Sequence, residues 1–428
     1  MIDAITALCG AQRHGRSGNE YRWHRDRWSD WCGLRISKVE TIRHAALPNL
    51  LWVQLHSEDG LIGLGETFYL PAAVESVIHD VIAAFILNRA DCSPESIWDQ
   101  VFSYCNFFGH AGAEMRALSA VDIALWDLLG QKTGEPIYQL LGGKLRQEIP
   151  IYNTCVDTEI YRDHEGFMER PGELAKELLA QGIKAMKVWP WDRFAPKLET
   201  TAISGPAGYL SMGPSGSFLS LKDLDAGLSV VKKIRDAVGR DIEILIEGHS
   251  RWDLNCAIRI GRALEPYDVL WMEDMMKPES AADLSRLAAE TRVPHSVSER
   301  LFTRFAYRQV LEAHAAQIIM PDLVWTGGIT EGHKIAILAD AFHLPIAPHD
   351  CTGLVTIFAN LHLCAASPNA MILETVRGFC EGWYRWVYTD NVQIEDGKAS
   401  FSDSPGLGTR LKPEFLANPA TTTRISAA

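Results

Sequence analysis

From Glu148 onward the chain alternates short apolar runs with helical stretches, and this alternation restricts the fold more than any other feature. Eight runs rich in β-branched and aromatic residues follow one another: IPIYNT, IKAMKVW, IEILIEGH, DVLWMED, PHSVSE, AQIIMPD, LPIAPH and MILETV. The segments between them have helical periodicity and are long enough for right-handed crossovers between parallel strands. Eight such units predict an α/β protein built on a closed (β/α)8 barrel.

The residues before Glu148 have a different pattern. LRISKVETIRH and NLLWVQLHSEDGLIGLGET alternate apolar and polar residues, as antiparallel strands do, and helical patterns begin at Ala72, Pro94 and Glu114. A run of strands followed by a run of helices is typical of an α+β domain. We therefore expect an N-terminal extension over residues 1–33, an α+β domain over 34–145, the barrel over 146–385, and a C-terminal segment over 386–428 that returns to the α+β domain.

Two segments have no clear place in this scheme. Residues 1–33 are rich in Arg, His, Gly and Trp, and they could form a flexible tail, a strand-swapped arm or an artefact of start-site choice. A Gly-, Ser- and Pro-rich stretch over 202–220 interrupts the unit after the second barrel strand. We expect this stretch to be either a solvated insertion or a lid over the barrel mouth.

Charge and composition exclude several classes of partner. The net charge of −13 argues against nucleic acid, because binding a phosphate backbone needs a surplus of Lys and Arg. The nine cysteines include no pair at the spacing of a zinc or redox motif, so we expect reduced thiols. No signal-like apolar region or 18-residue apolar run is present. We expect a cytoplasmic homo-oligomer that acts on a small molecule, with no membrane partner.

Three carboxylates close consecutive predicted strands. Glu247, Glu273 and Glu299 are separated by equal intervals of 26 residues, which predicts corresponding heights at the carboxyl ends of the strands, where barrel enzymes keep their active sites. One acidic residue at the start of a loop is an ordinary structural feature, but three in register are not. Because such carboxylates repel one another in a partly dry pocket, we expect a cation, and oxygen ligands favour Mg²⁺.

Two histidines are the candidate acid and base groups. His349 and Asp322 end consecutive predicted strands, so the carboxylate can accept the imidazole N–H and raise the basicity of the ring. A buried structural histidine is the alternative. His249 lies two residues after Glu247, and both side chains point the same way if the backbone stays extended. His249 would then be a second acid or base, although a metal ligand or a loop residue is also open.

Further candidates lie beside these groups. Lys187 and Trp189 share the inward face of their strand by alternation, so Lys187 can hold a substrate carboxylate or stabilise an enediolate while Trp189 shapes the pocket. A surface position for Lys187 is the alternative. Residues just past strand ends could contact substrate or simply face solvent; these are Arg251, Arg300 and Trp325.

The sequence resembles the mandelate racemase-like branch of the enolase superfamily from about Leu34 to Phe415. The stretch ALSAVDIALWDLLGQKTGEPIYQLLGG and the segments MPDLVWTGGITEGHKIA and LPIAPH carry this resemblance. It implies an α+β capping domain over the barrel mouth, three Glu ligands for Mg²⁺, an Asp322–His349 dyad as the base, and Glu374 as a partner of the enediolate oxygen. The EGH and SERLFTRFAYRQVLEA segments are most similar to the galactonate dehydratase group.

The sequence departs from that family's pattern at two positions. Glu247 replaces the usual Asp, and Trp189 replaces the second Lys of the racemases' Lys-x-Lys pair. The expected reaction is therefore abstraction of a proton next to a carboxylate by His349, with loss of water assisted by His249, to a 2-keto-3-deoxy acid. An epimerase or cycloisomerase that uses Lys187 is the alternative within the superfamily, and a silent homologue that binds small acids is the alternative outside catalysis.

Overall fold

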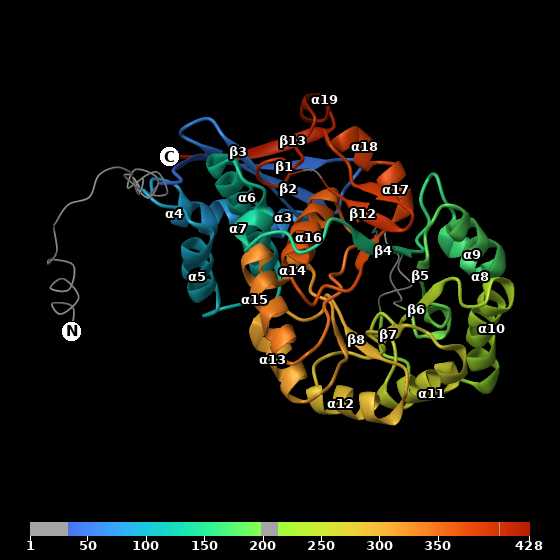
Figure 1. Ribbon diagram of the computed structural model, residues 1–428. Helices are drawn as coiled ribbons and strands as arrows, with labels where there is room; N and C mark the ends of the chain where they lie inside the picture. Colours follow the sequence, from blue (N-terminus) through green and yellow to red (C-terminus); the bar gives the residue numbers. More distant parts are fainter. Residues whose placement is uncertain (1–32, 198–212, 402) are drawn as a thin grey trace, which may run out of the picture. The chain divides into compact units, whose positions relative to one another are not determined.

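The N-terminal part of the molecule is built on a four-stranded antiparallel sheet, and one of its strands is the last strand of the chain. The computed structural model describes residues 33–197, 213–401 and 403–428, so residues 1–32 of the expected extension and 202–212 of the expected insertion lie outside the described residues. The strand order is β13-β1-β2-β3 (Figure 1). The strands are β1 (Ile36–His44), β2 (Leu50–Ser57), β3 (Ile62–Phe68) and β13 (Thr421–Ala427).

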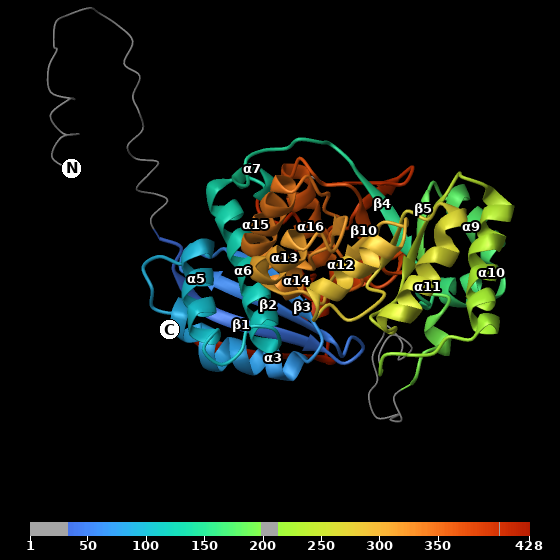
Figure 2. The same cartoon turned by 90° about the horizontal axis from the view of Figure 1, so that it is seen from below.

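Helices cover one face of this sheet. They are α3 (Pro71–Val77), a π-helical turn (Ile78–Ile82), α4 (Ala83–Ile86), α5 (Pro94–Cys105) and α6 (Ala113–Thr133), and the short helix α7 (Ile137–Leu140) follows α6. The long helix α6 packs closely on β3 (Figure 2). This packing needs glycine in the strand, because a Cβ at Gly65 would overlap the carbonyl oxygen of Ala120, and a Cβ at Gly63 would overlap that of Ala124.

We predict that Gly65→Ala destabilises the protein by about 1 to 3 kcal/mol or more, since relieving the overlap requires α6 to move away from the sheet. Thermal and urea unfolding would measure the loss. Gly112→Ala is the matched control, because its added Cβ meets only the flexible Glu114 carboxylate, at 3.2 Å. Equal stability of the two variants would contradict the prediction.

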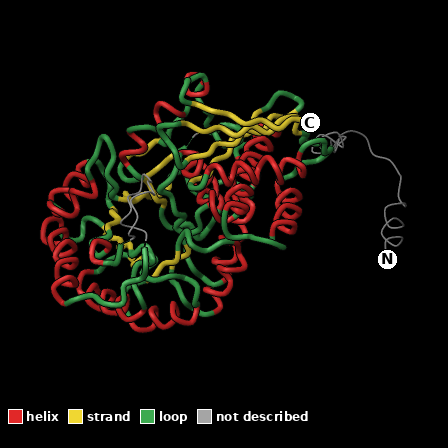
Figure 3. Tube along the Cα trace, turned by 180° about the vertical axis from the view of Figure 1, so that it is seen from behind, coloured by secondary structure: helices red, strands yellow, loops and turns green. Residues whose placement is uncertain are grey.

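The barrel consists of short parallel strands in chain order, surrounded by helices (Figure 3). The strands are β4 (Ile149–Thr154), β5 (Ala185–Val188), β6 (Glu243–Glu247), β7 (Trp271–Glu273), β8 (His295–Val297), β9 (Ile318–Ile319) and β10 (Leu373–Thr375). The predicted seventh strand, LPIAPH, is reduced to Ile346, which bridges Ile319 and Ala370. Because β10 pairs with β4, the ring closes, and the predicted (β/α)8 barrel with its α+β partner domain is confirmed.

Helices connect the barrel strands, and a small hairpin lies in the segment that follows the last barrel strand. The barrel helices are α8 (Asp163–Glu169), α9 (Pro171–Ala180), a 3-10 turn (Asp192–Phe194), α10 (Leu221–Val238), α11 (Leu254–Leu264), a 3-10 turn (Glu265–Tyr267), α12 (Ala281–Glu290), α13 (Thr303–Glu312), α14 (Leu323–Thr326), α15 (Gly328–Ala341) and α16 (Leu354–Ala366). After them come α17 (Arg377–Glu381), α18 (Tyr384–Val387), β11 (Gln393–Glu395), β12 (Lys398–Ser400) and α19 (Pro413–Leu416). Strand β12 pairs with β4, so the C-terminal segment contacts the barrel before β13 reaches the other sheet.

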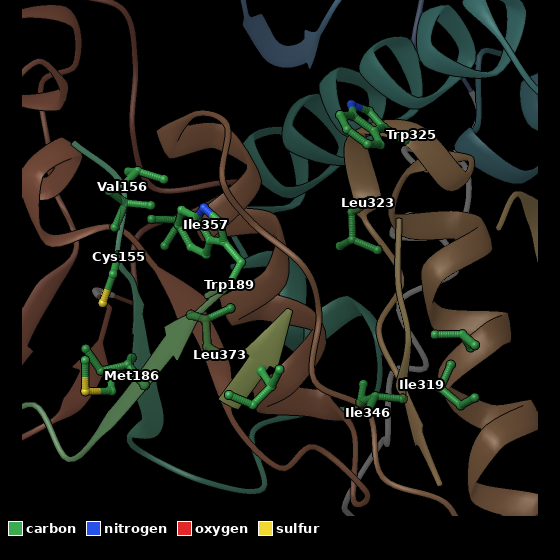
Figure 4. Close-up of a cluster of buried hydrophobic side chains, with 14 of the residues drawn as sticks. Cys155, Val156, Met186, Trp189, Ile319, Leu323, Trp325, Ile346, Ile357 and Leu373 are labelled. Carbon is green, nitrogen blue, oxygen red and sulfur yellow. The ribbon is translucent and has the colours of Figure 1, made fainter. Parts of the chain in front are cut away.

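Alternation along the strands separates two apolar layers. Met186, Ile319, Ile346 and Leu373 belong to the layer between the strands and the helices (Figure 4). The inner layer fills the barrel and consists of Tyr152, Ala185, Leu245, Trp271, Ile318, Met320, Ala347 and Ile372. Residues two positions after the inner ones therefore also face inward, nearer the mouth. Among the described residues, no helix combines the length and the hydropathy that crossing a membrane requires.

Candidate active site

Four ionisable side chains lie directly above the inner apolar layer. Lys187, Glu247, Glu273 and Glu374 each follow an inner-layer residue by two positions, and each is at most 5% exposed. Glu247 and Glu273 are register partners on β6 and β7, as the spacing predicts. Glu299 is not at the same height, because Ser296 is the partner of Glu273. The equal spacing was misleading here, since β8 ends at Val297 and Glu299 lies in the loop that follows.

The ammonium group of Lys187 lies among these carboxylates. Its Nζ is 2.9 Å from Glu273 Oε1, 2.8 Å from Glu374 Oε1 and 3.3 Å from Glu247 Oε2. Burial alone would lower the pKa of Lys187, but the neighbouring carboxylates raise it well above its usual value. Lys187 therefore carries a positive charge inside the barrel, and the surface position considered from the sequence is wrong.

The carboxylates still outnumber the cations around them. Burial, followed by charge repulsion, raises the pKa of Glu273, and burial likewise raises that of Glu247 although Lys187 opposes it. Asp274, next to Glu273, is buried, and its Oδ2 has no hydrogen-bond partner among the described residues. This all-oxygen donor set suits a hard divalent cation. In the described part of the chain, however, no three His, Cys, Asp or Glu side chains stand in a group that could hold an ion as they are.

His349 and Asp322 form the expected pair. His349 Nδ1 is 2.8 Å from Asp322 Oδ2, and Asp322 also accepts a hydrogen bond from the backbone N–H of Val324. His349 Nε2 is 3.9 Å from both Glu299 Oε2 and Glu374 Oε2. Burial opposes protonation, but these carboxylates raise the pKa of His349 well above its usual value. The pair therefore has one ring nitrogen anchored and the other directed toward the carboxylate group.

His249 is placed by a turn and not by an extended strand. Strand β6 ends at Glu247, and His249 and Ser250 have φ values of 44° and 55°. The backbone is therefore not extended from Glu247 to His249, so strand alternation does not give these two side chains the same direction. Instead, Glu247 Oε1 accepts hydrogen bonds from the backbone N–H groups of Gly248 and His249, and this bends the loop.

A second imidazole–carboxylate pair results from this turn. His249 Nδ1 lies 2.6 Å from Oδ2 of Asp192, whose side chain is 1% exposed. Oδ1 of Asp192 has no hydrogen-bond partner in the described part of the chain, where the side-chain partner of this carboxylate is His249. Asp192 was not among the residues predicted from the sequence. It lies in a 3-10 turn three residues after Trp189, with no strand end or spacing to mark it.

Both histidines line one cavity of about 660 Å³. The barrel contributes Glu299, Arg300, Trp325, His349 and Cys351, and the capping domain contributes Phe68, Tyr69, His110 and Arg116. Phe68, Tyr69 and His110 thus lie in the lining, whereas Phe107, near them in the sequence, is 94% exposed on the surface. The capping domain forms part of the wall, as expected.

Two of the predicted substrate-binding residues are outside this lining. Trp189 lies one residue beyond β5 in the outer apolar layer, where its ring meets the edge of His249 at a centroid distance of 5.5 Å. The predicted inward direction of Trp189 is wrong because the strand ends at Val188. Arg251 is 1% exposed and donates to the carbonyl oxygen of Pro196, so it supports the neighbouring loop. Arg300 and Trp325 do line the cavity.

Family models cover most of the chain. The N-terminal domain model of mandelate racemase and muconate lactonizing enzyme matches residues 37–142, and the enolase C-terminal domain-like model matches 171–415. The chain belongs to the mandelate racemase and muconate lactonizing enzyme family. The resemblance stated from the sequence is thereby confirmed, and the chain is an enzyme of the enolase superfamily.

Relatives within this family match nearly the whole chain. A D-galactonate dehydratase of Pectobacterium atrosepticum is 31% identical over 390 residues, which are 90% of this chain and 94% of the relative. A solved enolase of the mandelate racemase subgroup from Agrobacterium tumefaciens is 40% identical, with a TM-score of 0.81, and covers 92% of this chain and 99% of its own. An enolase superfamily member from Salmonella Typhimurium is 27% identical, with a TM-score of 0.82 and the same coverage.

Proposed function

We propose that this family member is a Mg²⁺-dependent dehydratase of an acid sugar, either an aldonate or an aldarate. The observation that carries the proposal is that two histidines, His349 and His249, line one cavity, and a carboxylate holds each ring at Nδ1. One histidine can remove a proton while the other delivers one. The relatives named D-galactonate dehydratase support this class of reaction.

In the proposed reaction, Nε2 of His349 removes the proton from the carbon next to the substrate carboxylate, which leaves an enediolate. Asp322 orients the ring and stabilises the imidazolium that forms. His249 then donates a proton to the hydroxyl on the next carbon, the C–O bond breaks, and water leaves. The resulting enol tautomerises to a 2-keto-3-deoxy acid. The atoms balance without an oxidant or a reductant.

The negative charge of the enediolate needs stabilisation that is already in place. We propose that Lys187 and Glu374 act on the carboxylate end of the substrate, and that Glu247, Glu273 and Glu299 hold the Mg²⁺. When bound, Mg²⁺ would offset the carboxylate charge and polarise the substrate carboxylate. Arg300 and Trp325 would contact the rest of the substrate from the cavity wall. Trp189 would shape the site indirectly, through its contact with His249.

The position of Lys187 distinguishes this proposal from an epimerase. His249 shares the described cavity lining with His349, whereas Lys187 is held below it by three carboxylates. Incubating the enzyme and Mg²⁺ with a panel of aldonates and aldarates tests the proposal. Formation of a keto acid is expected for a subset of the panel. Epimers without any keto acid would contradict dehydration.

Asp192 has a separate expected effect. Asp192→Asn should lower kcat for dehydration by up to about 100-fold, because misorienting a catalytic ring by about 1 Å can cost that much. KM and exchange of the substrate α-proton should change little, since His349 is untouched. Steady-state kinetics and NMR in deuterated buffer would measure both. Asp157→Asn is the matched control, because Asp157 contacts backbone N–H groups and does not contact His249. Equal kcat values for the two variants would contradict the role of Asp192.

A further inference from the structure

Arg116 reaches from the capping domain into the wall of the active-site cavity. It lies in the first turn of α6, and its Nε donates a hydrogen bond to the carbonyl oxygen of Phe68 at 3.2 Å. Its guanidinium carbon is 4.6 Å from the ring centre of Trp325 and 5.8 Å from that of Phe302. All four residues line the cavity. The guanidinium is therefore held in place by a carbonyl oxygen and two aromatic faces.

No carboxylate forms an ion pair with Arg116 among the residues that the structure describes. Other partly or fully buried arginines have such partners: Arg377 pairs with Asp163, and Arg304 pairs with Glu331. A guanidinium has five N–H donors, and within the described residues Arg116 makes one hydrogen bond, through Nε–H. Burial lowers the pKa of Arg116, although the more distant Asp322, Tyr69 and Glu299 oppose this. N–H groups that lack a hydrogen-bond acceptor in a partly buried site lower the stability of the protein unless a ligand supplies the acceptor.

Arg116 and the proposed base both lie close to Trp325. The ring centres of Trp325 and His349 are 5.9 Å apart, and Arg116 lies over the same tryptophan. A substrate whose reacting carbon meets His349 can therefore extend along Trp325 toward the guanidinium. A carboxylate matches the planar fork of arginine with two hydrogen bonds, whereas a terminal hydroxyl leaves the charge without a counter-charge.

We infer that Arg116 binds a second carboxylate, at the far end of the substrate, and that the enzyme acts on dicarboxylic acid sugars. This inference rests on the proposed dehydration and selects the aldarate class within it. Among the described residues, Arg300 and Lys277 also bring positive charge to the cavity lining. Arg300 is engaged, because it lies 3.7 Å from carboxylate oxygens of Asp274 and Glu299 and donates to the carbonyl oxygen of His249. Lys277 is exposed at the rim.

The test compares six-carbon aldarates with the aldonates of the same stereochemistry, using the full-length enzyme and Mg²⁺. The wild-type enzyme should have the higher kcat/KM for a diacid. Arg116→Met should lower that value by about 100-fold, mainly through KM, because charged hydrogen bonds are lost. The loss for the monoacid should be much smaller, because the monoacid has no second carboxylate to bind. The kcat/KM of Arg116→Lys for the diacid should lie between those of the wild type and Arg116→Met, since lysine keeps the positive charge but lacks the planar pair of N–H donors.

Arg43→Met is the matched control, because Arg43 pairs with Glu75 on the capping sheet and does not line the cavity. The inference is overturned if the wild-type enzyme prefers aldonates, or if Arg116→Met loses activity equally on both acids. It is also overturned if the diacid-specific loss is found in Lys277→Met and not in Arg116→Met.

A binding measurement separates this inference from the proposed function. With Mg²⁺ present, an aldarate should raise the unfolding temperature of the wild-type protein and of Arg116→Lys more than that of Arg116→Met, since only ligands that bind the native state stabilise it. If no acid sugar is dehydrated but this difference is found, the reaction is wrong and the diacid site stands. If keto acids form and the stabilisation is equal in all variants, the site is wrong and the reaction stands.

Discussion

The His349→Asn variant is expected to lose both keto-acid formation and exchange of the substrate α-proton with solvent. Without the imidazole no enediolate forms, and removing a general base typically slows a reaction by about 10²- to 10⁴-fold. The geometry supports this choice of base, because Asp322 anchors Nδ1 at 2.8 Å and leaves Nε2 for the substrate. Product assays and NMR in deuterated buffer would measure the two losses. His343→Asn, at an exposed loop position, is the matched control.

The His249→Asn variant should separate the two steps that His349→Asn removes together. Dehydration should stop, while α-proton exchange remains measurable, because the proposed base and its partner Asp322 are intact. Wild-type dehydration by His249→Asn would contradict the assignment. If α-proton exchange persists in His349→Asn and disappears in Lys187→Met, Lys187 is the base. The reaction is then that of an epimerase or cycloisomerase and not a dehydration.

The second large effect should follow removal of divalent metal. Chelation is expected to lower turnover by about a thousandfold, the equivalent of the several kcal/mol that a metal ion contributes to a developing charge. Adding Mg²⁺ should restore it. Glu273→Gln should weaken Mg²⁺ binding and abolish turnover, because it removes one charge from the centre of the buried carboxylate group. Isothermal titration with Mg²⁺ alone measures the binding independently of activity.

Glu290→Gln is the control for this substitution, since Glu290 forms a surface pair with Arg262 and is remote from the barrel mouth. Full turnover in an exhaustively chelated sample would exclude the proposed role of the metal. Unchanged Mg²⁺ affinity in Glu273→Gln would show instead that the ion is held elsewhere.

Local patterns were sufficient for much of the fold and for part of the site. Strand alternation is a property of neighbouring residues and placed Lys187 on the inner face of the barrel, and the equal spacing of strand ends placed Glu247 beside Glu273. Consecutive strand ends likewise brought Asp322 to His349. The same reasoning was wrong where a strand was shorter than its pattern, because alternation holds only inside the strand. Glu299 and Trp189 both lie past a strand end.

The sequence by itself therefore determined the barrel, its partner domain and the residues that the strands direct inward, because a two-residue period and a strand end can be read locally. Tertiary structure decided which loop residues meet. Asp192 reaches His249 across 57 residues through two turns, and Arg116 reaches the cavity only because α6 packs against the loop and helix that carry Trp325. Such contacts depend on loop conformation and on the docking of one domain on another, and neither leaves a periodic signal in the sequence.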